Sequence, residues 1–218
     1  MNFRILSMSA ALLLTAVATF AQNPITADSP FQVRYIANIP RGDSVINITN
    51  TGASSTVAFP TQNGNICANV YAFSPDEQLI SCCSCVITPD GLVSLSARND
   101  LISNTLTPAV PTSIVVKLIA STGTVVAGAT ACNASTLGAN GVNILAIGMA
   151  AWGTSVTALR PGADATPYTI TETPFTPSTL SIAEAQRLNT LCAFIQTNGS
   201  GFGVCRSCRL GGLGAAKD

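Results

Sequence analysis

The stretch LISCCSCVITPDG, residues 79–91, places three cysteines within four positions and ends in a turn signal. Its apolar and β-branched residues predict a strand, and the Pro-Asp-Gly that follows is typical of a tight turn. Successive side chains of a strand point to opposite faces, so Cys83 and Cys85 share one face and Cys82 lies on the other. A single metal ion cannot bind all three cysteines in that geometry, whereas disulfides can form on both faces. We therefore predict a strand that is cross-linked to other parts of the chain.

Two turn sequences, SPDE and TPDG, flank this strand and predict a three-stranded meander over residues 66–98. The implied register places Cys67 opposite Ser84, on the face that carries Cys82, and pairs the cysteine strand with residues 92–98. A slip of one residue would exchange the two faces.

Short runs rich in Val, Ile, Thr and aromatic residues recur along the chain from residue 31, separated by Gly, Pro, Asn and Asp. The expected strands are 31–38, 43–50, 66–73, 78–87, 92–98, 112–121, two pieces on either side of Gly153 within 142–159, and 167–172. Residues 99–111 and 128–141 are expected to be longer loops. Short strands at this spacing predict a mostly β protein, an antiparallel β-sandwich that is immunoglobulin-like in outline.

The pattern changes at residues 174–180, a proline-containing linker. The segment that follows, SIAEAQRLNTLCAFIQTNG, repeats apolar residues at helical spacing. Ser181 with Glu184 forms a capping-box signature at its start, and Asn198-Gly199 is a typical stop. We predict one C-terminal helix, covering residues 182–196, whose apolar stripe must lie on the sheet.

The first 21 residues predict a signal peptide. Arg4 gives a positive start, residues 5–17 are apolar, and Thr19-Phe20-Ala21 supplies small residues at the cleavage positions. Cleavage after Ala21 would leave 22–173 as the sandwich domain and 174–218 as a helix and cysteine-containing tail packed on the same domain. No later segment approaches the roughly 20 apolar residues of a membrane helix, so we expect no membrane span after signal removal. The chain is therefore expected to be secreted or periplasmic.

All eight cysteines follow the predicted signal peptide, and an even number in an exported chain favours disulfides. The disulfide candidates are Cys67, Cys82, Cys83, Cys85, Cys132, Cys192, Cys205 and Cys208. The C-x-x-C spacing of 82–85 and of 205–208 leaves a four-cysteine metal site or a thiol-redox pair as alternatives. We expect Cys83, Cys85 or both to be bonded to the three C-terminal cysteines, and so to hold the helix against their face of the sheet.

Charged residues make up only 9% of the chain, ten basic against ten acidic, and histidine is absent. This balance argues against nucleic acid as a partner. Without histidine, the commonest general base and the nucleophile pairs that use it are missing. Asp76-Glu77 lies in a predicted turn, GSGFG at 199–203 follows a helix rather than a strand, and Trp152 lies in an apolar run. We therefore predict no enzyme activity, no cofactor and no metal site.

Three stretches, ICANVYAFSPDEQLISCCSC, SLSARNDLISNTLTP and GSGFGVCRSCRLGGLG, resemble a group of secreted cysteine-rich bacterial proteins of unknown function. The resemblance covers most of the chain after the predicted signal, and the paired cysteine clusters are its most specific part. It implies a bacterial, cell-envelope origin, and no activity or site residues.

These observations favour a non-enzymatic secreted structural or surface protein, an assembly subunit stabilised by disulfides. Low charge leaves edge strands poorly guarded against pairing with neighbours, so further copies of the chain or other envelope proteins are the expected partners. The extended segment 23–40 could add a strand to another copy, although pairing within its own sheet is the simpler expectation. Two alternatives remain: a thiol-redox or metal-binding protein that uses the C-x-x-C pairs, and a carbohydrate-binding module by analogy of fold.

Overall fold

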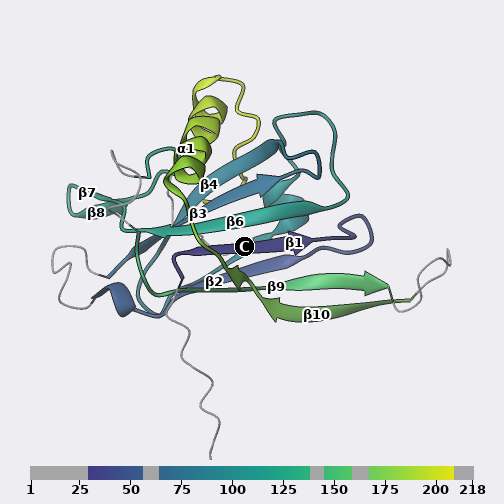
Figure 1. The fold of residues 1–218 in the computed structure, drawn as a ribbon, viewed down its shortest axis with the longest axis horizontal. Coiled ribbons are helices and arrows are strands. Elements are labelled where there is room, and N and C mark those ends of the chain that lie inside the picture. The colour runs from purple at the N-terminus through teal and green to yellow at the C-terminus, as the bar shows by residue number, and fades with distance from the viewer. Residues whose placement is uncertain (1–28, 56–63, 138–144, 159–166, 209–218) are drawn as a thin grey trace, which may run out of the picture.

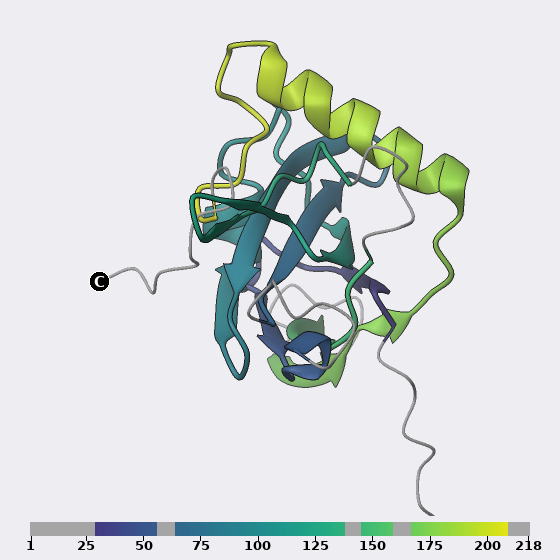
Figure 2. The ribbon, with the colours of Figure 1, turned by 90° about the vertical axis from the view of Figure 1, so that its left-hand side faces the viewer.

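The computed structural model describes residues 29–55, 64–137, 145–158 and 167–208, and the predicted signal peptide lies outside them. Two antiparallel sheets pack face to face, and a helix covers the outer face of one of them (Figure 1). Figure 2 shows the same layers from the side, with the helix above the sheets. This arrangement confirms the predicted two-sheet sandwich with a C-terminal helix.

Sheet A carries the helix and has five strands in the order β11-β1-β6-β3-β4. They are β1 (Phe31–Ile36), β3 (Ile66–Phe73), β4 (Leu79–Ile87), β6 (Ile114–Ser121) and the two-residue β11 (Thr176–Pro177). Every residue of β3 and β4 is buried. Neither strand contains a charged residue, because both of its faces are covered by other parts of the protein.

Sheet B has four strands in the order β10-β9-β2-β5. They are β2 (Val45–Asn50), β5 (Leu92–Ser96), β9 (Met149–Ala158) and β10 (Tyr168–Pro174). Smaller elements are the hairpin β7 (Thr124–Val126) and β8 (Ala129–Ala131), the 3-10 turn η1 (Ala53–Ser55) and the π-helical turn η2 (Ala97–Leu101). In β2 and β5 every second residue is buried, because one face of sheet B meets the core and the other meets water.

The predicted three-stranded meander is wrong in its third strand. β3 and β4 form a hairpin, but after the TPDG turn the chain crosses to sheet B, where β5 pairs with β2 and Ser96 lies opposite Val45. The burial pattern explains the crossing, since β5 needs one face in water whereas β4 is covered on both faces. The buried Asn50 side chain fixes the turn by donating a hydrogen bond to the Ile87 carbonyl at 3.0 Å.

The register of the β3–β4 hairpin differs by two residues from the predicted one, and β3 contains a bulge near its end. Cys67 lies opposite Val86 instead of Ser84. A shift by an even number of residues leaves every side chain on its predicted face. Cys67 and Cys82 therefore share the outer face of sheet A, and the other two cysteines of β4 point into the core between the sheets.

β9 runs as one strand through Gly153 and not as two pieces. A Cβ at this position would lie 3.1 Å from the Val45 carbonyl oxygen and 3.2 Å from Nε of Arg34. The glycine therefore makes room for an arginine between the sheets. The expected loop 128–141 includes strand β8, and the expected loop 99–111 begins in η2.

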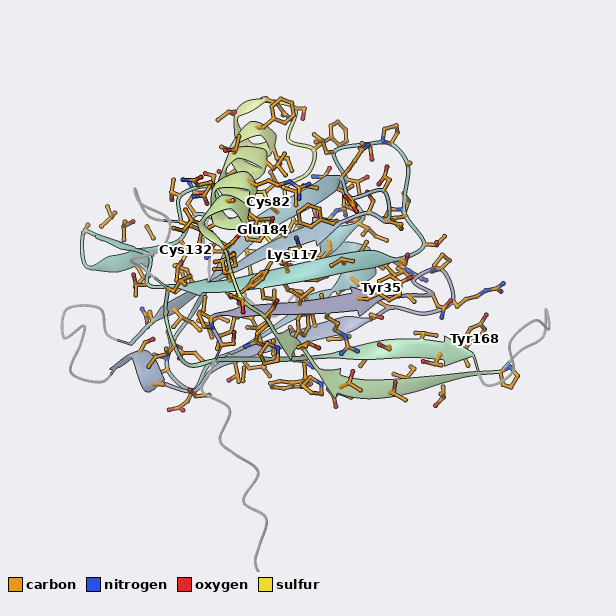
Figure 3. The ribbon with its side chains drawn as sticks, in the orientation of Figure 1. Tyr35, Cys82, Lys117, Cys132, Tyr168 and Glu184 are labelled. Carbon is orange, nitrogen blue, oxygen red and sulfur yellow. A yellow bond between two sulfur atoms is a disulfide. The ribbon has the colours of Figure 1, made fainter. Side chains whose placement is uncertain are left out.

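The helix α1 (Ile182–Thr197) packs on the outer face of sheet A and confirms the predicted helix. Ser181 Oγ accepts a hydrogen bond from the Glu184 backbone N–H at 3.1 Å, as the capping signature predicts. The Glu184 side chain pairs instead with Lys117 of β6, and Figure 3 shows the two residues at the start of the helix. Leu188 and Cys192 pack with Tyr71 of β3 in a second core beneath the helix. No helix among the described residues is long and apolar enough to cross a membrane.

Candidate functional site

The structure joins all eight cysteines in four disulfides. The pairs are Cys67–Cys132, Cys82–Cys192, Cys83–Cys205 and Cys85–Cys208. The expected bonds from Cys83 and Cys85 to the C-terminal cysteines are confirmed. The expected position of the helix is wrong: it covers the Cys82 face and bonds to that cysteine. Cys83 and Cys85 instead receive the tail, which enters the core between the sheets.

Neither C-x-x-C pair has the geometry of a metal or redox pair in this structure. Cys82 and Cys85 lie on opposite faces of β4, and Cys205 and Cys208 are each bonded to a β4 cysteine instead of to each other. Metal binding and thiol exchange require thiolates, which these bonds consume. Within the described residues no group of three or more His, Cys, Asp or Glu side chains is placed to hold a metal ion.

The C-terminal tail seals the outer edge of β4. The Cys82 backbone N–H donates to the Gly203 carbonyl at 2.8 Å, and the Cys205 N–H donates to the Cys82 carbonyl at 3.4 Å. Val204 forms a parallel bridge with Cys82 between these bonds. Farther along the same edge, the Leu106 N–H donates to the Ile80 carbonyl at 2.9 Å. The glycine-rich GSGFG stretch therefore ends in a short strand partner for β4 and not in a phosphate-binding loop.

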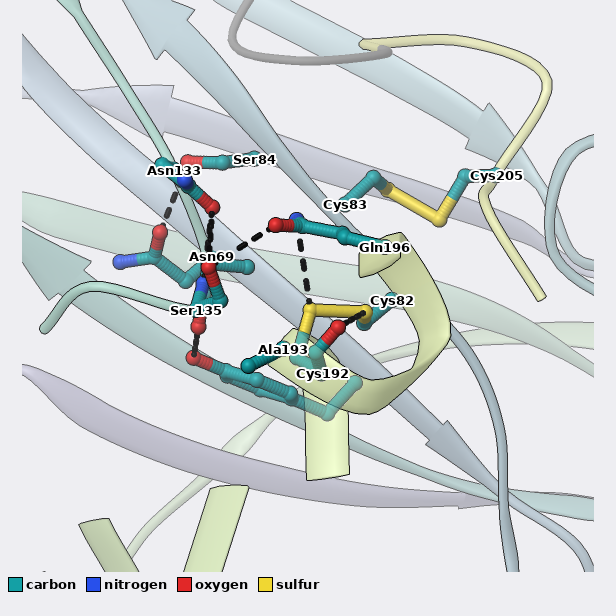
Figure 4. The surroundings of a disulfide bond; sticks show 12 residues. Asn69, Cys82, Cys83, Ser84, Asn133, Ser135, Cys192, Ala193, Gln196 and Cys205 are labelled. Atoms are coloured by element: carbon teal, nitrogen blue, oxygen red, sulfur yellow. Dashed lines mark hydrogen bonds between the residues drawn. A yellow bond between two sulfur atoms is a disulfide. The ribbon is translucent and has the colours of Figure 1, made fainter. Parts of the chain in front are cut away.

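A hydrogen-bonded side chain also connects the helix to the segment that carries Cys132. Gln196 Nε2 lies 3.5 Å from Sγ of Cys192, and its Oε1 accepts from Ser135 Oγ at 2.8 Å (Figure 4). Tyr71 lies beneath this contact, fully buried, and its hydroxyl donates to the Ala134 carbonyl at 2.7 Å. Burial raises the pKa of the Tyr71 hydroxyl. The side of the sandwich that is formed by β4, the helix and the C-terminal tail is thus a sealed side, closed by covalent bonds and by buried hydrogen bonds.

β10 lies at the opposite edge of the sandwich, at the bottom in Figure 1, and within the described residues it pairs only with β9. The Phe175 N–H donates to the Ala151 carbonyl at 2.8 Å, which fixes the alternation of the ladder. Every second residue before Phe175 therefore bonds to β9. The backbone groups of Tyr168, Ile170 and Glu172 face outward instead. Their side chains lie on the outer face of sheet B, where Ile170 is 66% exposed.

Arg34 of β1 anchors the end of β10 from the other sheet. Its Nη1 donates to the Thr173 carbonyl at 2.7 Å, and its Nη2 donates to Ser155 Oγ at 2.6 Å. The residue is only 7% exposed, and none of the ion pairs between described residues includes it. Burial lowers the pKa of its guanidinium. A carbonyl oxygen of β10 and a hydroxyl oxygen of β9 thus take the place of a carboxylate partner.

A groove of about 490 Å³ lies beside Arg34 and is lined by Tyr35, Ser155, Thr173 and Ser178, among others. Tyr35 is exposed at the end of β1, on the same side of the molecule as Tyr168 of β10 (Figure 3). On the side of β1 away from β6, the two-residue β11 is the only neighbouring strand among the described residues. The arrangement offers main-chain donors and acceptors beside exposed aliphatic and aromatic side chains, which is what an added strand requires.

The other motifs of the sequence take structural positions. Asp76 accepts from Ser74 Oγ in the exposed β3–β4 turn, and Glu77 beside it has a positive φ of 64°. Trp152 is partly buried and lies opposite Pro174 in the β9–β10 register. The chain contains no histidine, so these side chains do not form an acid–base pair of the common kind.

Sequence reasoning missed both Arg34 and the open edge. A signal for the arginine exists in FQVRYI, because Gln32, Arg34 and Ile36 alternate onto one face and Ile36 is apolar. Comparisons of the chain with protein-family models, with curated proteins and with solved structures found no match.

Proposed function

We propose that the protein is a non-catalytic structural or assembly subunit outside the cytoplasm, which docks to its partner through the open edge of sheet B. The observation that carries this proposal is the difference between the two edges. The edge at β4 is covered by the tail and locked by disulfides, whereas β10 keeps outward N–H and C=O groups and an exposed Ile170. An exposed edge with β-branched residues favours pairing with another strand.

The rigidity of the edge supports the same proposal. Arg34 fixes the end of β10 to the opposite sheet, and β9 pairs with β10 along its length. A template that is already ordered loses little conformational entropy on binding, so more of the interaction free energy appears as affinity. Such an edge is preorganised to receive a strand.

An oxidising location agrees with the four disulfides, because cross-links of this kind persist in secreted and periplasmic proteins and are rare in the cytosol. The predicted signal peptide and the resemblance to secreted bacterial proteins support an origin in a bacterial envelope. Self-association or contact with other envelope proteins is the proposed mode of action.

Cross-linking in the cells that make the protein tests this function. A photoreactive amino acid at position 170 should give a cross-linked adduct with a protein partner. Leu92 is the matched control, because it is 56% exposed on the outer face of the same sheet but belongs to β5 at the other edge. The same probe at position 92 should give no adduct. Absence of an adduct at 170, or equal adducts from both positions, would contradict the proposed function.

A further inference from the structure

We infer that the occupant of the open edge is a second copy of this chain, which adds its own β10 antiparallel to the first. The inference rests on the proposed function, because it names the partner for the same edge. The product is a dimer with twofold symmetry, in which two four-stranded sheets join into one continuous sheet.

The sequence of β10 allows two antiparallel copies of the strand to pair across such an axis. In YTITETP the outward-facing backbone groups belong to Tyr168, Ile170 and Glu172. An antiparallel partner must present outward groups to outward groups, and a register centred on Ile170 does this for all three residues. Ile170 then lies opposite Ile170 of the second copy, with the threonines on either side opposite each other. Threonine and isoleucine pairs of this kind stabilise neighbouring strands.

Pro174 selects this register over its neighbour. A register centred on Thr171 would also match outward groups, but it would bring Pro174 opposite Tyr168 of the second copy. Proline has no N–H to donate and places its ring where the ladder bond would form. Centring on Ile170 leaves the proline just beyond the paired segment. Pro174 thus marks the end of the segment of β10 that can pair with a second copy.

Charge complementarity points to the same arrangement. The Arg41 guanidinium carbon lies 5.9 Å from the centre of the Tyr168 ring, and Arg41 belongs to none of the ion pairs between described residues. Glu172 is exposed, and its contact with Asn47 is a hydrogen bond of 3.4 Å. In the register centred on Ile170, Tyr168 of one copy lies opposite Glu172 of the other. The carboxylate therefore arrives beside Arg41, and symmetry repeats the pair on the other side of the axis.

The contact is small, since it involves one strand and the loop that carries Arg41. Interfaces of limited area are typically reversible, so the dimer should form and dissociate with concentration. Its main-chain bonds give affinity, and the Ile170 and Arg41–Glu172 contacts give the register.

Sedimentation equilibrium of the purified, oxidised protein over a range of concentrations is the test. We expect a monomer–dimer equilibrium. Ile170→Lys places like charges opposite each other on the axis and should raise the dissociation constant by about tenfold or more. Leu92→Lys is the control, since it adds the same charge to the outer face of β5 and should leave the dissociation constant unchanged. Circular dichroism should show both variants folded, because both positions are exposed.

A charge exchange tests the register. Arg41→Glu and Glu172→Arg should each weaken the dimer, because each brings like charges together across the axis, and the double variant should restore it. The alternative is that the extended N-terminal segment, and not β10, pairs with the second copy. A variant lacking residues 22–28 should therefore dimerise like the intact protein. A purely monomeric protein, a dimer that withstands Ile170→Lys, or a dimer lost on removal of 22–28 would overturn the inference. A cross-link from position 170 to a different protein would also overturn it while leaving the proposed function intact, whereas no cross-link would contradict both.

Discussion

β4 and β10 are both edge strands, yet they lie on opposite sides of the sandwich and are treated in opposite ways. All nine residues of β4 are buried, and its edge away from β3 is hydrogen-bonded to residues 203–205 of the tail. β10 has mostly exposed residues and no strand beyond it among the described elements. An apolar strand such as LISCCSCVI would be a site of aggregation if its edge were open. A strand that alternates threonine with larger residues, as YTITET does, can remain in water until a partner pairs with it.

The disulfides concentrate on the strand that most needs protection. Three of the four bonds start in β4, and their partners follow one another along the chain at 192, 205 and 208. Because the three loops overlap along the chain, the bonds do not each close a long new loop. Once Cys82–Cys192 has formed, Cys83–Cys205 closes only about 15 further residues, which is worth about 3 kcal/mol in the chain-entropy model. The first bond holds the helix on the sheet, and the other two hold the tail along the edge.

Opening the sealed edge should produce the largest effect. We expect replacement of Cys83, Cys85, Cys205 and Cys208 by alanine to lower the free energy of unfolding by roughly 3–5 kcal/mol. Cys82–Cys192 stays in place, so the helix should remain while the tail after residue 198 is released. Limited proteolysis should then cut the tail, urea unfolding should show the lost stability, and the uncovered β4 should promote aggregation.

Removal of Cys67–Cys132 by alanine substitutions is the matched control. This bond lies on the outer face of sheet A, away from the tail, and closes a separation of 65 residues. Its loss should lower stability but leave the tail resistant to protease. A tail that remains equally resistant without Cys83–Cys205 and Cys85–Cys208 would show that hydrogen bonds alone seal β4.

Loosening the open edge should have a smaller effect. Arg34→Ala removes the donors to the Thr173 carbonyl and to Ser155, and hydrogen bonds from a charged group are worth about 1.5–3 kcal/mol each. We expect a loss of about 2–3 kcal/mol in the free energy of unfolding. Relative to the wild type, the variant should exchange hydrogen faster at the β10 amides that bond to β9. The increase there should be larger than at the amides of β3 or β4.

Arg34→Lys separates charge from geometry. Lysine keeps the positive charge, but a single ammonium group cannot reproduce the fork that bridges β9 and β10. This variant should lose most of the same protection. Unchanged exchange at β10 in both variants would mean that pairing with β9 alone holds the edge.

Local sequence patterns predicted the strands of the two sheets except the two-residue β11, the helix and the faces of the cysteines, but not the β7–β8 hairpin. The helix was recognisable from apolar residues spaced about 3.6 apart, and the strands from alternation with a period of two. The faces of the cysteines were predicted correctly because a register shift of two residues leaves each side chain on the same face. The helix cap followed from Ser181 and Glu184 because a cap involves neighbours in the chain.

The path of β5 and the site at β10 could not be predicted in this way. TPDG predicts that the chain reverses, but it does not say which sheet receives the next strand. That depends on Asn50, 37 residues before the carbonyl it bonds. The partners of Arg34 on β9 and β10 are 121 and 139 residues away in sequence. Contacts at such separations leave no local periodicity.

Alkaline pH should report on the sealed side with the smallest effect. Tyr71 is fully buried beneath α1, and burial raises the pKa of its hydroxyl. In the unfolded chain the hydroxyl ionises near pH 10, so above this value the folded state holds one proton more than the unfolded state. The free energy of unfolding should therefore fall with rising pH by about 1.4 kcal/mol per pH unit from this group.

Tyr71→Phe removes the ionisable group and leaves the Ala134 carbonyl without its donor. At neutral pH the variant should be less stable by about 1 kcal/mol, because a buried acceptor is left unpaired. Above about pH 10 the wild type loses stability through Tyr71 and the variant does not, so their free energies of unfolding in urea should converge and then cross. Curves that stay parallel to about pH 11 would show that the Tyr71 hydroxyl ionises in the folded protein, and so that water reaches it beneath the helix. The sealed side would then be closed to strands but open to solvent, and the contrast with the β10 edge would rest on the disulfides and the main-chain hydrogen bonds of the tail.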